Sequence, residues 1–407
     1  MTTEPAPRTL PPVLDDEAAL AVAAALGAKI APSAIERDRD RRLPGPELDL
    51  LSASGLLGIT VPAEFGGRPV SARTLASVFL SLARGDASIA QIPQSHMTFL
   101  DALRRQGSTE QQRRFFAEAL AGHRFANAQS ERGTPSIAVD RTTVTSRPDG
   151  TSSLNGTKYY STGALFAHWL VVRGVQASPG EQGDQSRKVL AYIPADAPGV
   201  LVEDDWDGLG QRTTASGTVT LTDVVVPADS LVPYSALFDG ATTYGARAQL
   251  LHAAIDAGIA RAAVDTAREV VVVARPPVDA DVATADRDPL LLQQFGEVEI
   301  GVRGAEALVR EAGEAIDVAE RELTPDSSAA ASIATAAAKV ASARASLDAT
   351  TALFDAGGTR SAAASLRLDR LWRDARTHTL HDPVRWKTQH VGRYALTGAH
   401  PPRHGLI

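Results

Sequence analysis

The chain has 407 residues, of which 44% are hydrophobic and 22% are charged, and its formal net charge is −7. This length predicts two or three domains, and the acidic balance argues against a nucleic-acid partner. The sequence contains no cysteine, which excludes disulfides, thiolate nucleophiles and cysteine-ligated metal clusters, so redox chemistry would require a bound cofactor.

The first segment, residues 1–123, is predicted to be helical after a proline-rich start. "DDEAALAVAAALGAKI" opens with acidic residues, which suit a helix N-terminus, and Ser71 is placed to cap the helix "SARTLASVFLSLARG". The start lacks a basic segment followed by an apolar core, and no run of eighteen apolar residues follows. We therefore expect a cytoplasmic protein with no membrane partner.

The second segment, residues 124–233, is predicted to be a β domain. "TTVTSRPDGTSSLNGTKYYSTG" has an Asp-Gly turn between runs of β-favouring residues, which predicts a hairpin. "HWLVVRGVQA", "KVLAYIP" and "GVLVEDDW" predict further strands. In "SGTVTLTDVVVP", Thr218, Thr220 and Thr222 alternate with Val219 and Leu221, as a half-buried strand requires.

The third segment, residues 234–407, is predicted to form a four-helix bundle followed by a tail. Three long apolar-periodic runs begin near Ala246, Asp288 and Asp326, and Thr324-Pro325 is a suitable start for the third. "SAAASLRLDRLWRDARTH" is expected to be the fourth helix. The whole pattern indicates an α+β protein with a helical domain, a central β domain and a C-terminal bundle.

Five of the nine histidines lie in the last thirty residues, and His378, His381, Asp382 and His390 fall close together. On a helix, His378 and His381 would project from the same side. The residues alone leave two readings open, a solvated helix end or a His-x-x-His metal site with His390 as third ligand. We expect no metal, because no other residue nearby has ligand spacing.

Three motifs, in the correct order, resemble the acyl-CoA dehydrogenase superfamily of flavoproteins. They are "GLLGITVPAEFGG", "NGTKYYSTGA" and "LWRDAR". Where the dehydrogenases carry a glutamate base after the last motif, this chain has "THTLHDPV", with Asp382 at the glutamate position. That segment is similar to the monooxygenase branch, which includes dibenzothiophene monooxygenase and SfnB-like sulfur-acquisition oxidoreductases.

This resemblance implies a fold, a cofactor and partners. It implies the acyl-CoA dehydrogenase-like fold, assembled as a homotetramer. It also implies a monooxygenase that takes reduced FMN from a separate flavin reductase and uses O2 to oxygenate a small substrate, with organosulfur compounds as the expected class. The dehydrogenase motif that grips FAD is reduced to Arg275-Pro-Pro-Val, which favours the smaller FMN over FAD.

The resemblance also implies roles for the histidines. His381 is the expected catalytic residue facing the flavin, supported by His378 or Asp382. His96, in "QIPQSHMTF", is expected to line the substrate side, although a buried structural histidine is an equal reading of its sequence. Histidine suits oxygen chemistry because it donates and accepts protons near neutral pH.

A second set of residues is expected to bind the cofactor. Asn127 and Ser130 would meet the polar edge of the isoalloxazine ring, and Tyr160 would stack on it. Ser161, also a catalytic candidate, and Thr162 would bring hydroxyls to the ring. Trp206 would wall the pocket and Arg275 would bind the phosphate, with "AGGTRS" (356–361) as a further phosphate candidate from a neighbouring subunit.

Two alternatives remain at this point. The first is an FAD-dependent dehydrogenase of the same fold in which Asp382 is the base. This base would be one methylene shorter than glutamate, and Pro383 would alter its approach. The second is a flavin-free oligomeric scaffold, against which the polar residues at each expected flavin contact argue.

Overall fold

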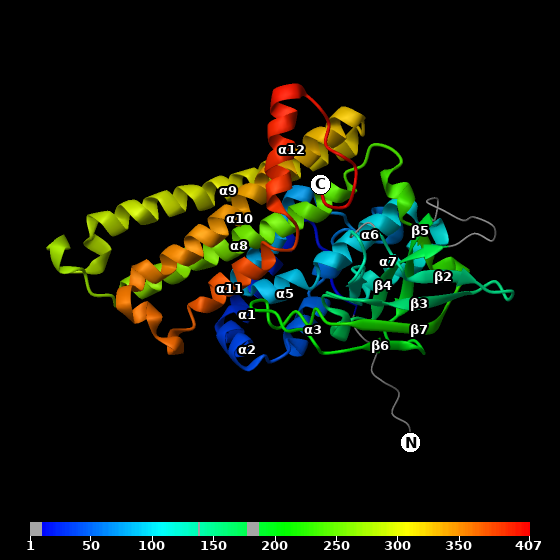
Figure 1. Ribbon diagram of the computed structural model, residues 1–407, viewed down its shortest axis with the longest axis horizontal. Coiled ribbons are helices and arrows are strands. Elements are labelled where there is room, and N and C mark those ends of the chain that lie inside the picture. Colours follow the sequence, from blue (N-terminus) through cyan, green and yellow to red (C-terminus); the bar gives the residue numbers. More distant parts are fainter. Residues whose placement is uncertain (1–9, 137–138, 177–186) are drawn as a thin grey trace, which may run out of the picture.

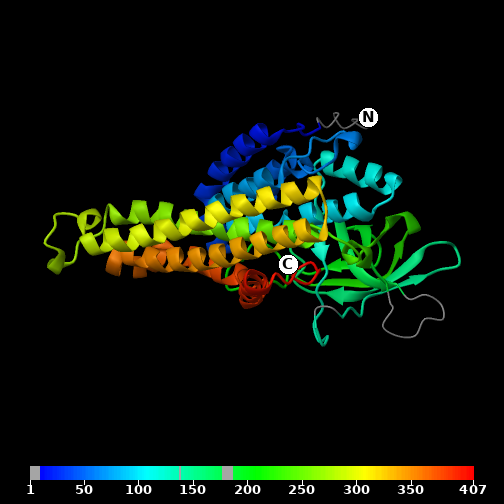
Figure 2. The same ribbon diagram turned by 90° about the horizontal axis from the view of Figure 1, so that it is seen from above.

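The structure is a computed structural model that describes residues 10–136, 139–176 and 187–407. Short N-terminal helices lie where a β sheet meets three long helices (Figure 1). Seen from above, the long helices extend away from the sheet (Figure 2). The predicted order of helical, β and helical segments is confirmed.

The N-terminal helices begin where capping residues predict them. Ser71 Oγ accepts a hydrogen bond of 3.1 Å from Thr74 N at the start of α4. Two glycines let α1 and α4 approach closely, since a Cβ on Gly85 would lie 2.4 Å from the Gly27 carbonyl oxygen. The α-helices of this segment are α1 (Asp16–Ile30), α2 (Ala34–Asp40), α3 (Gly45–Ala53), α4 (Ala72–Gly85), α5 (Ala87–Gln91), α6 (Gln94–Gln106) and α7 (Thr109–Leu120).

One stretch of the described chain, Asp16–Asp40, is long and apolar enough to cross a membrane by length and composition alone. In the fold, its Ala19, Ala23 and Ile30 are buried in the hydrophobic core that α4 shares. Arg37, near its end, is fully buried and pairs with Asp86 at 2.8 Å. The stretch therefore packs as a core element of the helical segment.

The sheet brings strands far apart in sequence side by side. The predicted hairpin is confirmed as the antiparallel pair β2–β3, and β1 pairs with β4 in parallel. The order is β6-β7-β3-β2-β4-β5-β8. The strands are β1 (Phe125–Ala128), β2 (Thr143–Ser146), β3 (Ser152–Lys158), β4 (Trp169–Gln176), β5 (Arg187–Pro194), β6 (Val200–Val202), β7 (Val219–Val226) and β8 (Leu231–Pro233).

The expected alternation in β7 holds for its first half and then changes phase. Val219 and Leu221 are buried, and then Val224 and Val226 are buried in turn. The pairing with β3 shifts between these two pairs, where Asp223 adopts a positive φ of 51°. A β-bulge therefore returns the apolar side chains to the core face.

The C-terminal segment contains three long helices and two shorter ones. α10 packs against both α8 and α9, and α12 crosses the bundle near its middle (Figure 1). The predicted fourth helix is shorter than expected, because 3₁₀ turns occupy residues 358–362 and 364–366 and α11 begins only at Asp369. The helices are α8 (Tyr244–Val271), α9 (Pro289–Arg321), α10 (Pro325–Gly357), α11 (Asp369–His378) and α12 (Val384–Thr397).

Candidate active site

The turn after β3 carries several of the predicted cofactor-binding residues. Tyr160 has a positive φ of 56°, an unfavourable conformation for a bulky residue. Asn127, on β1, stabilises this turn by donating from Nδ2 to the Tyr160 carbonyl oxygen at 3.1 Å. The structure therefore brings these two predicted residues together.

Two buried polar atoms at this turn have no hydrogen-bond partner within the described chain. They are Asn127 Oδ1 and Ser161 Oγ. The Thr162 hydroxyl, in contrast, is engaged with Ser216 Oγ at 2.8 Å. Because buried polar atoms are normally hydrogen-bonded, Asn127 and Ser161 have the character of groups that meet a ligand, whereas Thr162 has a structural partner.

Trp206 lies beside this turn and belongs to a loop that reaches α11. Its indole packs edge-on against the Tyr160 ring, with centroids 6.3 Å apart, and its Nε1 donates to the Gln211 carbonyl oxygen at 2.9 Å. Gln211 N in turn donates to Asp374 Oδ1 of α11 at 2.6 Å. Burial raises the pKa of Asp374 to about 7, against the opposing charge of Arg370. The loop thus joins the sheet side of the site to α11.

α11 ends at His378, which belongs to a cluster of three imidazoles, His252, His378 and His381, with His252 at its centre. His378 Nδ1 lies 2.6 Å from Asp256 Oδ1, and its Nε2 lies 3.1 Å from His252 Nδ1. His381 packs on the other side of His252, with ring centroids 3.9 Å apart. The prediction that His378 and His381 share a helix is wrong, but both contact His252, on α8.

Burial sets the protonation of the inner part of this imidazole cluster. It lowers the pKa of His378, against the opposing charge of Asp256, and holds that of His252 well below its usual range. Both rings are therefore neutral at pH 7. Asp256 itself is fully buried, and Lys339 Nζ lies 2.8 Å from its Oδ2, so the deepest charges are paired.

Asp382 cannot serve as a free base in this arrangement. It is buried and forms an ion pair with Lys387. Burial opposes its ionisation, but the neighbouring His381 ring and the charges of Lys339 and Lys387 hold its pKa well below the usual range. In this structure Asp382 fixes the turn beside His381, and its predicted catalytic part stays a prediction.

His96 is buried and bonded within the protein at both ring nitrogens, and its predicted place beside the substrate stays a prediction. Its Nε2 lies 2.8 Å from the Leu57 carbonyl oxygen, and its Nδ1 accepts from Phe125 N at 3.2 Å. Burial lowers the pKa of His96 to about 4. The residue that does reach the imidazole cluster from this segment is Gln91, whose Oε1 lies 2.9 Å from His378 Nε2.

Two other predicted residues, Ser130 and His390, have partners outside the imidazole cluster. Ser130 forms an isolated β-bridge with Tyr159, next to the Tyr160 turn. His390 lies on α12 beside Trp386, with ring centroids 6.1 Å apart, so it does not complete the His-x-x-His motif. Among the described residues, no three His, Asp or Glu side chains are grouped to hold a metal ion.

Arg275 belongs to the segment between α8 and α9, and this segment lies at the end of the bundle remote from the sheet (Figure 1). It is exposed, and within one chain it cannot join the residues around Tyr160. Arg360 donates to the Val273 carbonyl oxygen at 2.8 Å, which brings the turn at 356–361 to the same end. Both predicted phosphate-binding elements thus share one place in the fold.

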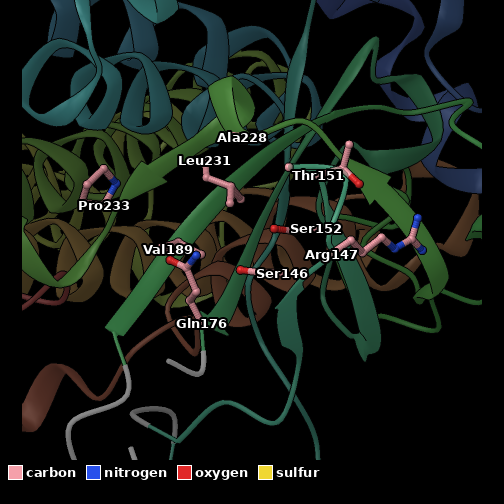
Figure 3. A pocket seen from close by; sticks show the side chains of 10 residues that line it. Ser146, Arg147, Thr151, Ser152, Gln176, Val189, Ala228, Leu231 and Pro233 are labelled. Carbon is pink, nitrogen blue, oxygen red and sulfur yellow. The ribbon is translucent and has the colours of Figure 1, made fainter. Parts of the chain in front are cut away.

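A separate pocket of about 390 Å³ opens on the sheet, between the β2–β3 hairpin and the strands β5 and β8 (Figure 3). Its cation, Arg147, is paired with Asp223 at 2.5 Å. The pocket shares no lining residue with the imidazole cluster. It therefore lies outside the candidate active site.

Sequence reasoning did not find Gln91, His252, Asp256 and Lys339. A signal was present for two of them, because His252 and Asp256 are four residues apart within the otherwise apolar run "LLHAAIDAGIA" and so lie on one helix face. Lys339 and Gln91 gave no such signal. Their partners are 83 and 287 residues away in the sequence.

Three family models match the chain in order. These are the acyl-CoA dehydrogenase N-terminal domain over residues 16–123, the middle domain over 126–224 and the C-terminal domain over 250–386. A dibenzothiophene monooxygenase from Rhodococcus qingshengii is 31% identical over 95% of both chains. SfnC of Pseudomonas putida, named as a probable FMNH2-dependent monooxygenase, is 33% identical over 94% of this chain and 96% of its own.

A crystal structure gives the same result in three dimensions. The dibenzothiophene monooxygenase TdsC from Paenibacillus sp. A11-2, crystallised with FMN and indole, superposes with a TM-score of 0.90. It is 33% identical, and the match covers 96% of this chain and 99% of TdsC. The likeness therefore extends over all three segments of the fold.

Proposed function

Because the chain belongs to the acyl-CoA dehydrogenase family, together with monooxygenases named for dibenzothiophene and for FMNH2, we propose that it is an FMN-dependent monooxygenase acting on small organosulfur compounds. It is an oxidoreductase of the two-component type, to which a separate reductase supplies reduced flavin. Its fold is the acyl-CoA dehydrogenase fold.

The residues around the Tyr160 turn fit a flavin ring. Asn127 Oδ1 and Ser161 Oγ are buried acceptors or donors without a protein partner, which a polar ring edge would satisfy. The side chain of Tyr160 is half exposed and rests on Trp206, so together they offer an aromatic wall. We assign Asn127, Ser161, Tyr160 and Trp206 to cofactor binding, with Ser130 and Thr162 as supports of the turn.

The proposal rests mainly on one observation: the chain presents an imidazole, and not a free carboxylate, just after α11. His381 is partly exposed and packs on the neutral ring of His252, whereas the one carboxylate beside it, Asp382, is locked in an ion pair with Lys387. An imidazole can give and take a proton near neutral pH, which oxygen transfer requires. The described residues beside His381 therefore offer no free carboxylate base for abstracting a substrate proton.

FMN, when bound in its reduced form, supplies the two electrons with which one atom of O2 enters the substrate and the other leaves as water. In this account His381 holds or gives the proton that the departing oxygen needs. His378, neutral and bonded to Asp256, supports His381 through His252. We assign Ser161 to the same site, where its buried hydroxyl would donate a hydrogen bond.

The assembly and the cellular setting are also part of the proposal. Arg275 and the turn at 356–361 lie together at the remote end of the bundle, so the phosphate they would hold belongs to a flavin bound by another copy of the chain. We expect a homotetramer in the cytoplasm, with FMN diffusing from the reductase.

The test is a coupled assay. Purified protein, a flavin reductase, NADH and FMN are supplied with a panel of sulfides, sulfoxides and sulfones, and oxygenated product is measured by mass spectrometry. We expect product only when FMN, reductase and protein are all present. Reduction of an artificial electron acceptor by acyl-CoA substrates, with no oxygenated product from the panel, would favour the dehydrogenase reading instead.

A further inference from the structure

His381 has less support from its own backbone than the other two imidazoles. It lies beyond the end of α11, and its N donates to the His378 carbonyl oxygen at 3.0 Å in a single turn. Its side chain is 39% exposed, and its Nδ1 lies 3.5 Å from Asp382 Oδ1, too far for a strong hydrogen bond. The ring contact with His252, at 3.9 Å between centroids, is therefore the main constraint on its orientation.

His252, in contrast, is fixed by a series of buried groups that contact one another. Asp256 accepts only, so the proton on His378 is at Nδ1 and its Nε2 carries a lone pair. That lone pair accepts from His252 Nδ1, 3.1 Å away. The His252 ring is thereby fixed in one tautomer and one orientation.

The series ends in a pair of buried charges. Asp256 Oδ2 pairs with Lys339 Nζ at 2.8 Å, and the side chains of both residues are 0% exposed. The pair joins α8 to α10, while His378 joins α8 to α11, so the three helices fix His252 together. The His252 ring is therefore fixed where it contacts the His381 ring.

We propose that His252 is a positioning residue whose ring is the platform that holds His381 in its working orientation. The arrangement Lys339–Asp256–His378 fixes the platform, and the platform fixes His381. The catalytic meaning of this role rests on the proposed monooxygenase function, but the positioning itself is a property of the flavin-free protein.

The test compares His252→Ala, which removes the platform, with His252→Phe, which restores a flat ring without the hydrogen bond. The flavin-free proteins are treated with diethylpyrocarbonate, and the modification of each histidine is followed by peptide mass spectrometry. His400, whose side chain is 43% exposed, serves as the internal reference. We expect the ratio of His381 to His400 modification to rise about twofold in His252→Ala, because a loosened turn opens to solvent, and to return toward the wild-type value in His252→Phe.

A second readout uses the coupled assay. We expect His252→Ala to release about tenfold more hydrogen peroxide per product, because small displacements of a catalytic group are costly, and His252→Phe to recover most of the coupling. If His381 reacts at the wild-type rate in both variants, the positioning role is overturned. If His381 reacts faster in His252→Ala but no variant or wild-type protein makes product, the proposed function fails and the positioning role stands.

Discussion

Replacing Lys339 by methionine tests the buried network most sharply. The substitution keeps most of the side-chain volume and removes the cation that lies 2.8 Å from the fully buried Asp256. Breaking a buried ion pair by removing one partner costs about 3–5 kcal/mol of unfolding free energy, since the remaining charge is left without compensation. An exposed pair would cost about 1 kcal/mol or less.

The loss should depend on pH, because His378 can replace the missing cation. With Lys339 gone, a proton on His378 would pair with Asp256 at 2.6 Å, so the folded-state pKa of His378 is higher in the variant than in the wild type, where the charge of Lys339 lowers it. Relative to the wild type, the variant therefore gains stability as the pH falls through this pKa and loses that gain as the pH rises. We therefore expect Lys339→Met to be less destabilising at acidic than at alkaline pH.

Urea denaturation followed by tryptophan fluorescence measures both effects. The double variant Asp256→Asn/Lys339→Met, which removes both charges and keeps an acceptor for His378, should regain most of the lost free energy. A loss near that of an exposed pair, or a double variant no more stable than Lys339→Met alone, would refute a buried and energetically coupled pair.

Three further predictions follow from single contacts. Asn127→Ala should weaken FMN binding about fivefold, as expected for one hydrogen bond, whereas Asn155→Ala, on β3, should not; flavin fluorescence titration distinguishes them. Gly210→Ala should lower the free energy of unfolding by about 1–3 kcal/mol and weaken FMN binding, because the new Cβ would lie 2.0 Å from the Arg373 carbonyl oxygen. Gly240→Ala is the control, since its Cβ would meet nothing within 4 Å and the variant should melt at the wild-type temperature. The pKa of His96, about 4 in the folded protein, lies below its unfolded value. Its contribution of about 3 kcal/mol to the free energy of unfolding is therefore lost as the pH falls from 6.5 toward 4. His96→Asn should flatten that part of the plot of stability against pH, and an unchanged slope would contradict the assignment.

Much of the fold was predictable because its signals are local. Ser71 and Thr324 cap the helices that they were expected to cap. The Asp-Gly turn produced the β2–β3 hairpin, and apolar periodicity marked the three long helices. The start of α11 was not predictable, since "SAAAS" has good helix-forming residues but 3₁₀ turns occupy that stretch between α10 and α11.

The site was predictable only where a motif carries it. The Tyr160 turn and Asn127 come together as expected, and His378 and His381 meet at one place. The contact that orients the His378 ring comes from Asp256, which is 122 residues away, and no local pattern encodes that pairing. His96 is bonded to Leu57 and Phe125, whereas the contact with His378 comes from Gln91, a neutral amide five residues earlier that carries no sequence signal.

The most direct measurement of the central claim is the fate of isotopically labelled oxygen. The purified protein is supplied with enzymatically reduced FMN, an organosulfur substrate found in the coupled assay and ¹⁸O2. We predict one ¹⁸O atom in each molecule of product. In His381→Ala we predict less labelled product and more hydrogen peroxide. Product that carries oxygen from water, or a His381→Ala variant with unchanged incorporation and coupling, would contradict it.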